Sequence, residues 1–135
     1  MQTPLPLILD CDPGIDDFIA ILMILASPER FNLLGITVSG GNVPVHFTAQ
    51  NALKACELTE RRDVKVYAGC PGPMLRSLVV EEGVHGTEGL KYVNLPKPTM
   101  PLQPTHAVDF LIETLLSSPQ KVTLATTGKS TAWVG

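Results

Sequence analysis

Short apolar runs alternate with helix-like segments along most of this chain, and this alternation restricts the possible folds strongly. Four runs rich in aliphatic and β-branched residues predict strands at 5–9, 31–38, 64–69 and 121–128. The intervening segments predict helices at 16–27, 45–60 and 105–118, the last of them capped by Thr105. Strands that alternate with helices form right-handed βαβ crossovers. The sequence therefore predicts an α/β fold, a Rossmann-like open parallel sheet with helices on both faces.

Three segments carry more detailed expectations. The helix at 16–27 is apolar on nearly every side, so we expect it to be buried all round. The helix at 45–60 should turn an apolar side that includes Leu58 toward the core. Residues 70–104 are rich in proline and glycine and predict a long loop, and such loops are usually functional or mobile.

Polar residues follow each predicted strand. They are Asp10 and Asp12 after the first strand, "SGGN" at 39–42, "AGC" at 68–70 and "TTG" at 126–128. Ligands of open parallel sheets bind outside the carboxyl ends of the strands. We therefore expect the candidate site to lie where these four stretches meet.

The stretch "LILDCDPGIDD" at 7–17 places four carboxylates within eight positions. Two like charges about 4 Å apart cost on the order of 4 kcal/mol at an effective dielectric constant near 20. Solvent, protons, helix-start amides or a cation can relieve such repulsion. In one interpretation Asp12 caps a helix that Asp16 and Asp17 merely begin. In the other, the carboxylates hold Ca²⁺ or Mg²⁺, which suits metal-assisted hydrolysis or phosphoryl transfer.

Composition excludes several classes of function. The formal net charge is −3 with both signs scattered, so the chain lacks the basic footprint of a nucleic-acid-binding protein. Three cysteines are spaced neither as a zinc site nor as a disulfide framework. The longest apolar run, 18–26, is too short to cross a membrane, and no leader pattern precedes it. We expect a cytoplasmic protein.

The acidic stretch resembles the signature of the inosine-uridine preferring nucleoside hydrolase family, D-x-D-P-G-x-D-D. "DCDPGIDD" at 10–17 matches every specified position. Three further stretches agree with the family in order and spacing, namely "ITVSGGN" at 36–42, "VKVYAGCPGPMLR" at 64–76 and "VHGTEGL" at 84–90. The resemblance runs from about residue 5 to 128. It implies the first half of the nucleoside hydrolase fold and hydrolysis of the N-glycosidic bond of ribonucleosides.

The resemblance also implies a calcium centre. Asp12 would be both a Ca²⁺ ligand and the base that activates water, and Asp17 would be a second ligand. The backbone carbonyl of Thr127 would be a further ligand, and Asp10 would orient these groups from behind.

Substrate contacts are implied in the same way. Asp16 would accept hydrogen bonds from the ribose hydroxyls, Asn42 would lie beside the ribose and the water, and His85 would contact the nucleobase from a closing loop. Without the resemblance, Asn42 is an ordinary turn residue and His85 a solvated loop residue.

The pattern of the family is lost after Gly128, where "KSTAWVG" follows and Ala132 stands in place of an asparagine. Residues 1–135 are interpreted as a single domain, the amino-terminal portion of a longer hydrolase domain. An alternative is a non-catalytic truncated product that binds metal, nucleoside or a full-length partner. The family resemblance favours a homodimer or homotetramer. Neither an Asp-x-Asp phosphotransferase nor a P-loop at "TTGKST" fits, because the glycines that these motifs need are absent.

Overall fold

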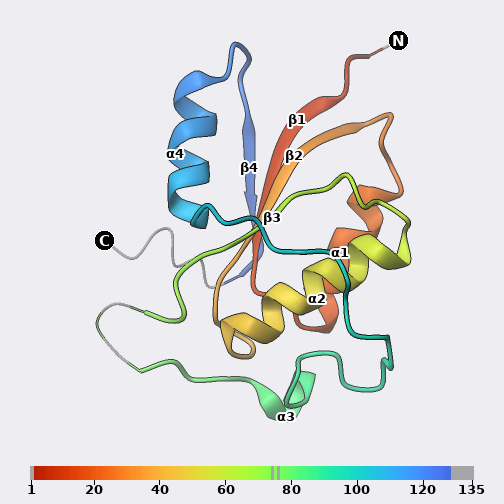
Figure 1. Cartoon of the computed structure of the whole chain (residues 1–135), viewed down its shortest axis with the longest axis vertical. Helices are drawn as coiled ribbons and strands as arrows, with labels where there is room; N and C mark the ends of the chain where they lie inside the picture. The colour runs from red at the N-terminus through yellow and green to blue at the C-terminus, as the bar shows by residue number, and fades with distance from the viewer. Residues whose placement is uncertain (1, 74, 76, 129–135) are drawn as a thin grey trace.

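The computed structural model describes residues 2–73, 75 and 77–128 and shows a parallel sheet between two layers of helices (Figure 1). The elements follow in the order β1 (Leu5–Cys11), α1 (Ile15–Leu25), β2 (Phe31–Val38), α2 (Val45–Leu58), β3 (Val66–Ala68), α3 (Glu82–His85), α4 (Ala107–Ser117) and β4 (Thr123–Thr126). The strand order is β3-β2-β1-β4 and every pairing is parallel. The predicted α/β sheet is confirmed.

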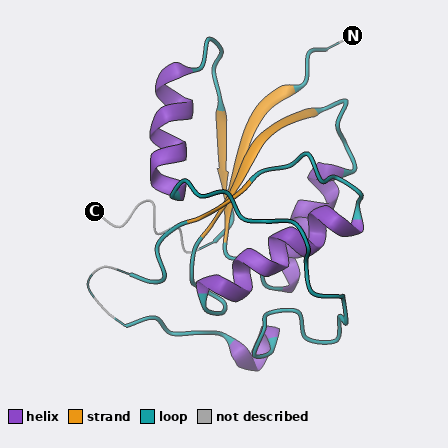
Figure 2. Cartoon of the chain, in the orientation of Figure 1, coloured by secondary structure: helices purple, strands orange, loops and turns teal. Residues whose placement is uncertain are grey.

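Alternation along β1 explains why both faces of the sheet are covered. Leu9 and Cys11 face a core that α1 and α2 close, whereas Ile8 faces a smaller core that α4 closes. Figure 2 shows the two layers, with α4 on one side of the strands and α1 and α2 on the other. Because β1 lies between β2 and β4, the segments that leave these three strands converge at one edge.

Helix boundaries agree with the sequence to within a few residues, but three expectations about the helices were wrong. His106, not Thr105, caps α4, and its Nδ1 accepts the N–H of Val108 at 3.2 Å. Helix α1 is not buried all round, because Ile19 and Met23 are 52% and 67% exposed. Leu58 is exposed as well, and it is the last residue of α2.

The long segment 70–104 is mostly irregular, as expected, but it contains the short helix α3. It runs below α1 and α2 in Figure 1 and returns along the sheet toward α4. Within the described part of the chain, no helix is long and apolar enough to cross a membrane.

A close approach in the smaller core requires a glycine in β2. The rings of Tyr67 and Phe110 stack with centroids 3.8 Å apart and planes 10° from parallel. A Cβ at Gly35 would lie 2.7 Å from Cζ of Phe110 and 3.1 Å from Cε2 of Tyr67. The register between β1 and β2 shifts between Leu7 and Ile8, opposite this position. The stacked pair therefore occupies the space that any side chain at residue 35 would need.

We predict that Gly35→Ala destabilises the protein by about 1–3 kcal/mol, because the new methyl group overpacks the stacked rings. Urea unfolding measures this change. Gly83→Ala is the matched control, since no atom lies within 4 Å of a Cβ at that position. Equal stability of the two variants would contradict the packing argument.

Candidate active site

Asp12 lies at the centre of the carboxyl edge of the sheet. It follows β1 directly, and the segments beyond β2 and β4 flank it. A Cβ at Gly41 would overlap Oδ2 of Asp12, and a Cβ at Gly128 would overlap Oδ1. Both glycines therefore leave room for the carboxylate of Asp12. Gly41 lies in the segment after β2, and Gly128 lies in the segment after β4. Gly128 adjoins Thr127, so the backbone of the predicted carbonyl ligand lies close to Asp12.

Hydrogen bonds hold Asp12 on three sides. Oδ2 accepts the backbone N–H of Asn42 at 2.9 Å, and the Asn42 side-chain amide donates to the Asp12 carbonyl at 2.9 Å. The backbone N–H of Asp12 donates to Oδ2 of Asp17 at 3.1 Å. Three predicted site residues are thus brought into direct contact, although they come from two separate strand ends and a helix.

Helix α1 begins without a side-chain cap, and Gly14 is its N-cap residue. The idea that Asp12 caps this helix is therefore wrong, because its carboxylate turns toward Asn42 instead. Asp16 and Asp17 stand in the first turn, where free backbone amides favour negative charge. Asp17 is buried beside Asp12, whereas Asp16 is exposed. The helix thus directs one carboxylate inward and leaves the other in contact with solvent.

Asp10 lies behind Asp12 in β1 and is almost fully buried. Its Oδ1 accepts the hydroxyl of Thr37 at 2.6 Å, and its carbonyl accepts the N–H of Thr127 at 3.0 Å. Its Oδ2 is buried with no hydrogen-bond partner among the described residues. A carboxylate oxygen buried without a partner is costly. Thr37 was not singled out from the sequence, where a threonine in a strand carries no functional signal.

Burial and like charge together disturb the ionisation of this cluster. The pKa of Asp12 is raised to about 7, first by burial and then by the hydrogen bond and negative charge of Asp17. Burial also raises the pKa of the Cys11 thiol well above its usual value, and the carboxylates around it add to the effect. Burial therefore disfavours the thiolate form of Cys11 in the metal-free chain.

His85 reaches the edge of this cluster from α3 and is buried, although the sequence suggested a closing loop. Its Nδ1 accepts the N–H of Ile15, the first residue of α1, at 3.1 Å. The ring packs against Gly14, where a Cβ would overlap it. Because Nδ1 acts as the acceptor in this contact, Nε2 is the ring nitrogen left to donate to a ligand. The predicted contact with a nucleobase stays a prediction.

Asn51 is a polar residue near the site that the sequence did not reveal. It lies on α2, is 1% exposed, and donates to the carbonyls of Pro13 and Glu88. In the sequence it is one polar residue of an amphipathic helix, and only the fold shows that it faces inward.

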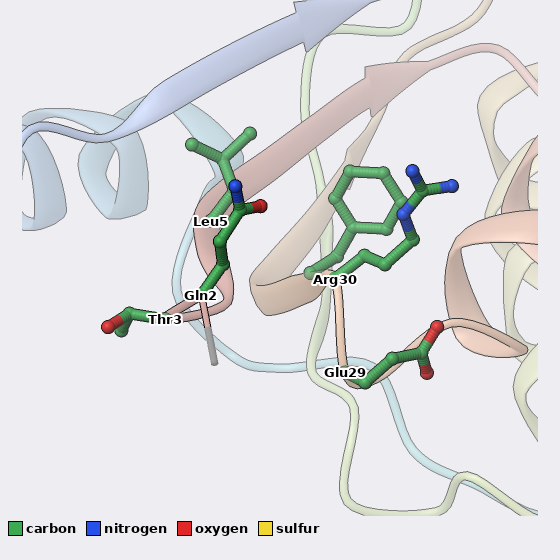
Figure 3. Close-up of a pocket in the computed structure, with 6 residues that line it drawn as sticks. Gln2, Thr3, Leu5, Glu29 and Arg30 are labelled. Atoms are coloured by element: carbon green, nitrogen blue, oxygen red, sulfur yellow. The ribbon is translucent and has the colours of Figure 1, made fainter.

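An open pocket in the structure lies away from these residues. Its lining comes from the amino-terminal starts of β1 and β2, and Figure 3 shows Gln2, Thr3, Leu5, Glu29 and Arg30 around it. The candidate site is instead at the opposite, carboxyl edge. In the described ranges, no group of three or more histidine, cysteine, aspartate or glutamate side chains is arranged to hold a metal ion. The predicted ligand set is compatible with this, because it consists of two carboxylates and a backbone carbonyl.

The sequence profile of the inosine-uridine preferring nucleoside hydrolase family matches residues 7–132 of this chain. The chain belongs to this family. It is 45% identical over 127 residues to the pyrimidine-specific ribonucleoside hydrolase RihA of Salmonella arizonae, a match that covers 94% of this chain and 40% of that protein. The chain thus spans about two fifths of the length of such curated relatives.

Solved structures of family members share this fold. A purine-preferring ribonucleoside hydrolase from Gardnerella vaginalis superposes with a TM-score of 0.84 at 34% identity, over 91% of this chain and 40% of that one. A plant nucleoside hydrolase superposes with a TM-score of 0.77 at 34% identity, over 93% and 40% of the two chains. The predicted relation to the first part of the nucleoside hydrolase fold is confirmed.

The raised pKa of Asp12 predicts how stability depends on pH when a chelator keeps cations away. The folded state retains a proton on Asp12 up to about pH 7, whereas the unfolded chain releases it near its ordinary pKa of 3.8. Stability should therefore fall as the pH rises between these values, with a slope approaching about 1.4 kcal/mol per pH unit. Urea unfolding at a series of pH values measures this slope. Asp12→Asn should flatten the profile, and an unchanged slope in that variant would assign the effect to other groups.

Proposed function

We propose that this chain provides the cation-binding and water-activating part of a ribonucleoside hydrolase, which cleaves the N-glycosidic bond to release free base and ribose. The observation that carries the proposal is the buried Asp12 carboxylate, held by Asn42 and paired with Asp17 at the carboxyl edge of the sheet. Membership of the nucleoside hydrolase family supports the reaction class.

Asp12 is the proposed base. In the metal-free chain, burial and Asp17 raise the pKa of Asp12 to about 7; a bound cation would lower this pKa and keep the carboxylate ionised, as a base requires. The backbone N–H of Asn42 binds one oxygen of its carboxylate at 2.9 Å and thereby fixes its orientation. Asp12 can thus accept a proton from a water molecule without changing its position.

Asp12 and Asp17 are also the proposed carboxylate ligands of a calcium ion, with the backbone carbonyl of Thr127 as a third. These donors suit the ion, because Ca²⁺ prefers carboxylate and carbonyl oxygens and a cation would offset the charge of two neighbouring buried carboxylates. When bound, such a cation lowers the pKa of a coordinated water. Calcium takes six to eight oxygen ligands, so these three groups would provide only part of its coordination.

The proposed substrate contacts use groups around the same edge. Asp16 is exposed at the start of α1, where it can accept hydrogen bonds from ribose hydroxyls. The side-chain amide of Asn42 donates to the Asp12 carbonyl at 2.9 Å, and its oxygen is the proposed acceptor for a ligand at this edge. His85, whose Nδ1 accepts the N–H of Ile15, is the proposed donor to the nucleobase through Nε2.

An activity assay tests the proposal. The 135-residue chain is incubated with inosine or uridine, in the presence of calcium or of a chelator, and the release of free base is measured. We expect calcium-dependent release, reduced about 10²- to 10⁴-fold in Asp12→Ala because the general base is lost. Asp63→Asn, which breaks an exposed ion pair with Arg61, is the control that retains activity. Calcium binding without any turnover would instead support the alternative of a non-catalytic binding protein.

Asp17→Asn separates metal binding from catalysis. We predict that it weakens calcium binding at least about tenfold, because the site loses one of its two carboxylate charges. Isothermal titration calorimetry measures the affinity, and thermal unfolding verifies that the variant is folded. Unchanged affinity would exclude Asp17 as a ligand.

A further inference from the structure

Asn51 joins the acidic turn to a distant part of the chain. Its side-chain amide donates to the carbonyl of Pro13 at 2.9 Å and to the carbonyl of Glu88 at 2.7 Å. Pro13 immediately follows Asp12, and Glu88 belongs to the segment after α3. A single buried side chain on α2 therefore bridges the site and a segment separated from it by 75 positions (88 minus 13).

Burial of the Asn51 side chain destabilises the folded state in one respect. Its Oδ1 is buried and has no hydrogen-bond partner in the described ranges of the chain. A buried acceptor without a partner destabilises the folded state, and most side chains around Asn51 on the inner side of α2 are apolar. The two bonds that the amide donates offset this cost, because otherwise two backbone carbonyls would lack their donor.

Close packing makes the bridge rigid. Gly89 has φ of +88°, a conformation that favours glycine. A Cβ at that position would lie 2.7 Å from Nδ2 of Asn51 and 3.1 Å from the Pro13 carbonyl. The backbone at Gly89 therefore approaches the amide and the turn as closely as glycine alone permits.

The bridged segment contacts the site at two more points. His85 accepts the N–H of Ile15 at 3.1 Å, which ties the segment to the start of α1. The N–H of Glu81 donates to the carbonyl of Asn42 at 2.8 Å, which ties it to the residue that holds Asp12. Residues 81–89 thus contact the site on both sides of the Asp12 carboxylate, and Asn51 fixes the far end of the segment.

We propose that Asn51 is a positioning residue. Its amide holds the Asp12-Pro13-Gly14 turn against residues 81–89 and so fixes the positions of Asp12, Asp17 and His85 relative to one another. The effect on cation binding rests on the function proposed above. The effect on the turn itself does not, because it follows from the hydrogen bonds of Asn51 alone.

Asn51→Asp tests this assignment, since it keeps the shape of the side chain but replaces the donor by an acceptor that faces two carbonyls. Asn51→Ser, which is smaller and keeps one donor, is the second variant should Asn51→Asp fail to fold. Cys56→Ala is the matched control, because Cys56 is fully buried on the same helix and belongs to the main core.

Amide hydrogen exchange followed by nuclear magnetic resonance provides the readout in the folded, metal-free chain. We expect the Ile15 and Asn42 amides to exchange at least about tenfold faster in Asn51→Asp. The amide of Ile36, bonded to the Lys65 carbonyl inside the sheet, should change no more than it does in Cys56→Ala. Exchange that rises equally at all three amides would overturn the proposal and leave Asn51 a general stabilising residue.

Calcium titration of the same variants separates the two proposals. Faster exchange at the turn together with weaker calcium binding, relative to Cys56→Ala, supports both. Faster exchange at the turn in a chain whose wild type binds no calcium supports the positioning role and contradicts the proposed calcium site. Calcium affinity equal to that of wild type, despite a loosened turn, would show that calcium binding does not depend on how Asn51 positions the turn.

Discussion

The burial of two carboxylates side by side is the constraint on which the rest of this structure depends. Asp12 and Asp17 are both almost fully excluded from solvent and are joined through the backbone N–H of Asp12. Nearby residues accommodate this pair. Gly41 and Gly128 lack side chains that would displace the carboxylate, Asn42 donates to it, and the start of α1 places backbone amides beside Asp17.

Sheet topology explains how such a pair forms at all. The order β3-β2-β1-β4 puts β1 between two parallel neighbours, so glycines following β2 and β4 reach Asp12 from opposite sides. A strand at the edge of the sheet would have had only one such neighbour. The crossover helices lie on the two faces of the sheet, and Asn42 and the 127–128 backbone converge at its carboxyl edge.

The local sequence pattern predicted much of this arrangement, because the periodicities of strands and helices depend on residues that are close together in the sequence. The strand at 31–38 and the cluster at 10–17 are examples. Features set by distant partners were not predictable. The exposure of Met23 depends on what covers α1, and the inward direction of Asn51 depends on carbonyls that other segments supply. Likewise, His85 looks like a loop residue until Ile15, 70 positions earlier, is placed against it.

A proton and a cation are alternative solutions to the same electrostatic problem in this site. Without a cation, burial and the charge of Asp17 raise the pKa of Asp12 to about 7, so a proton neutralises part of the pair near neutrality. The proposed divalent cation would supply the missing charge more completely, but it would have to displace that proton. Cation binding should therefore strengthen as the pH rises through this range, and it should lower the pKa of Asp12 in return. The ionised base and the proposed cation would thus favour each other, which joins the proposed metal binding to the chemistry proposed for this edge of the sheet.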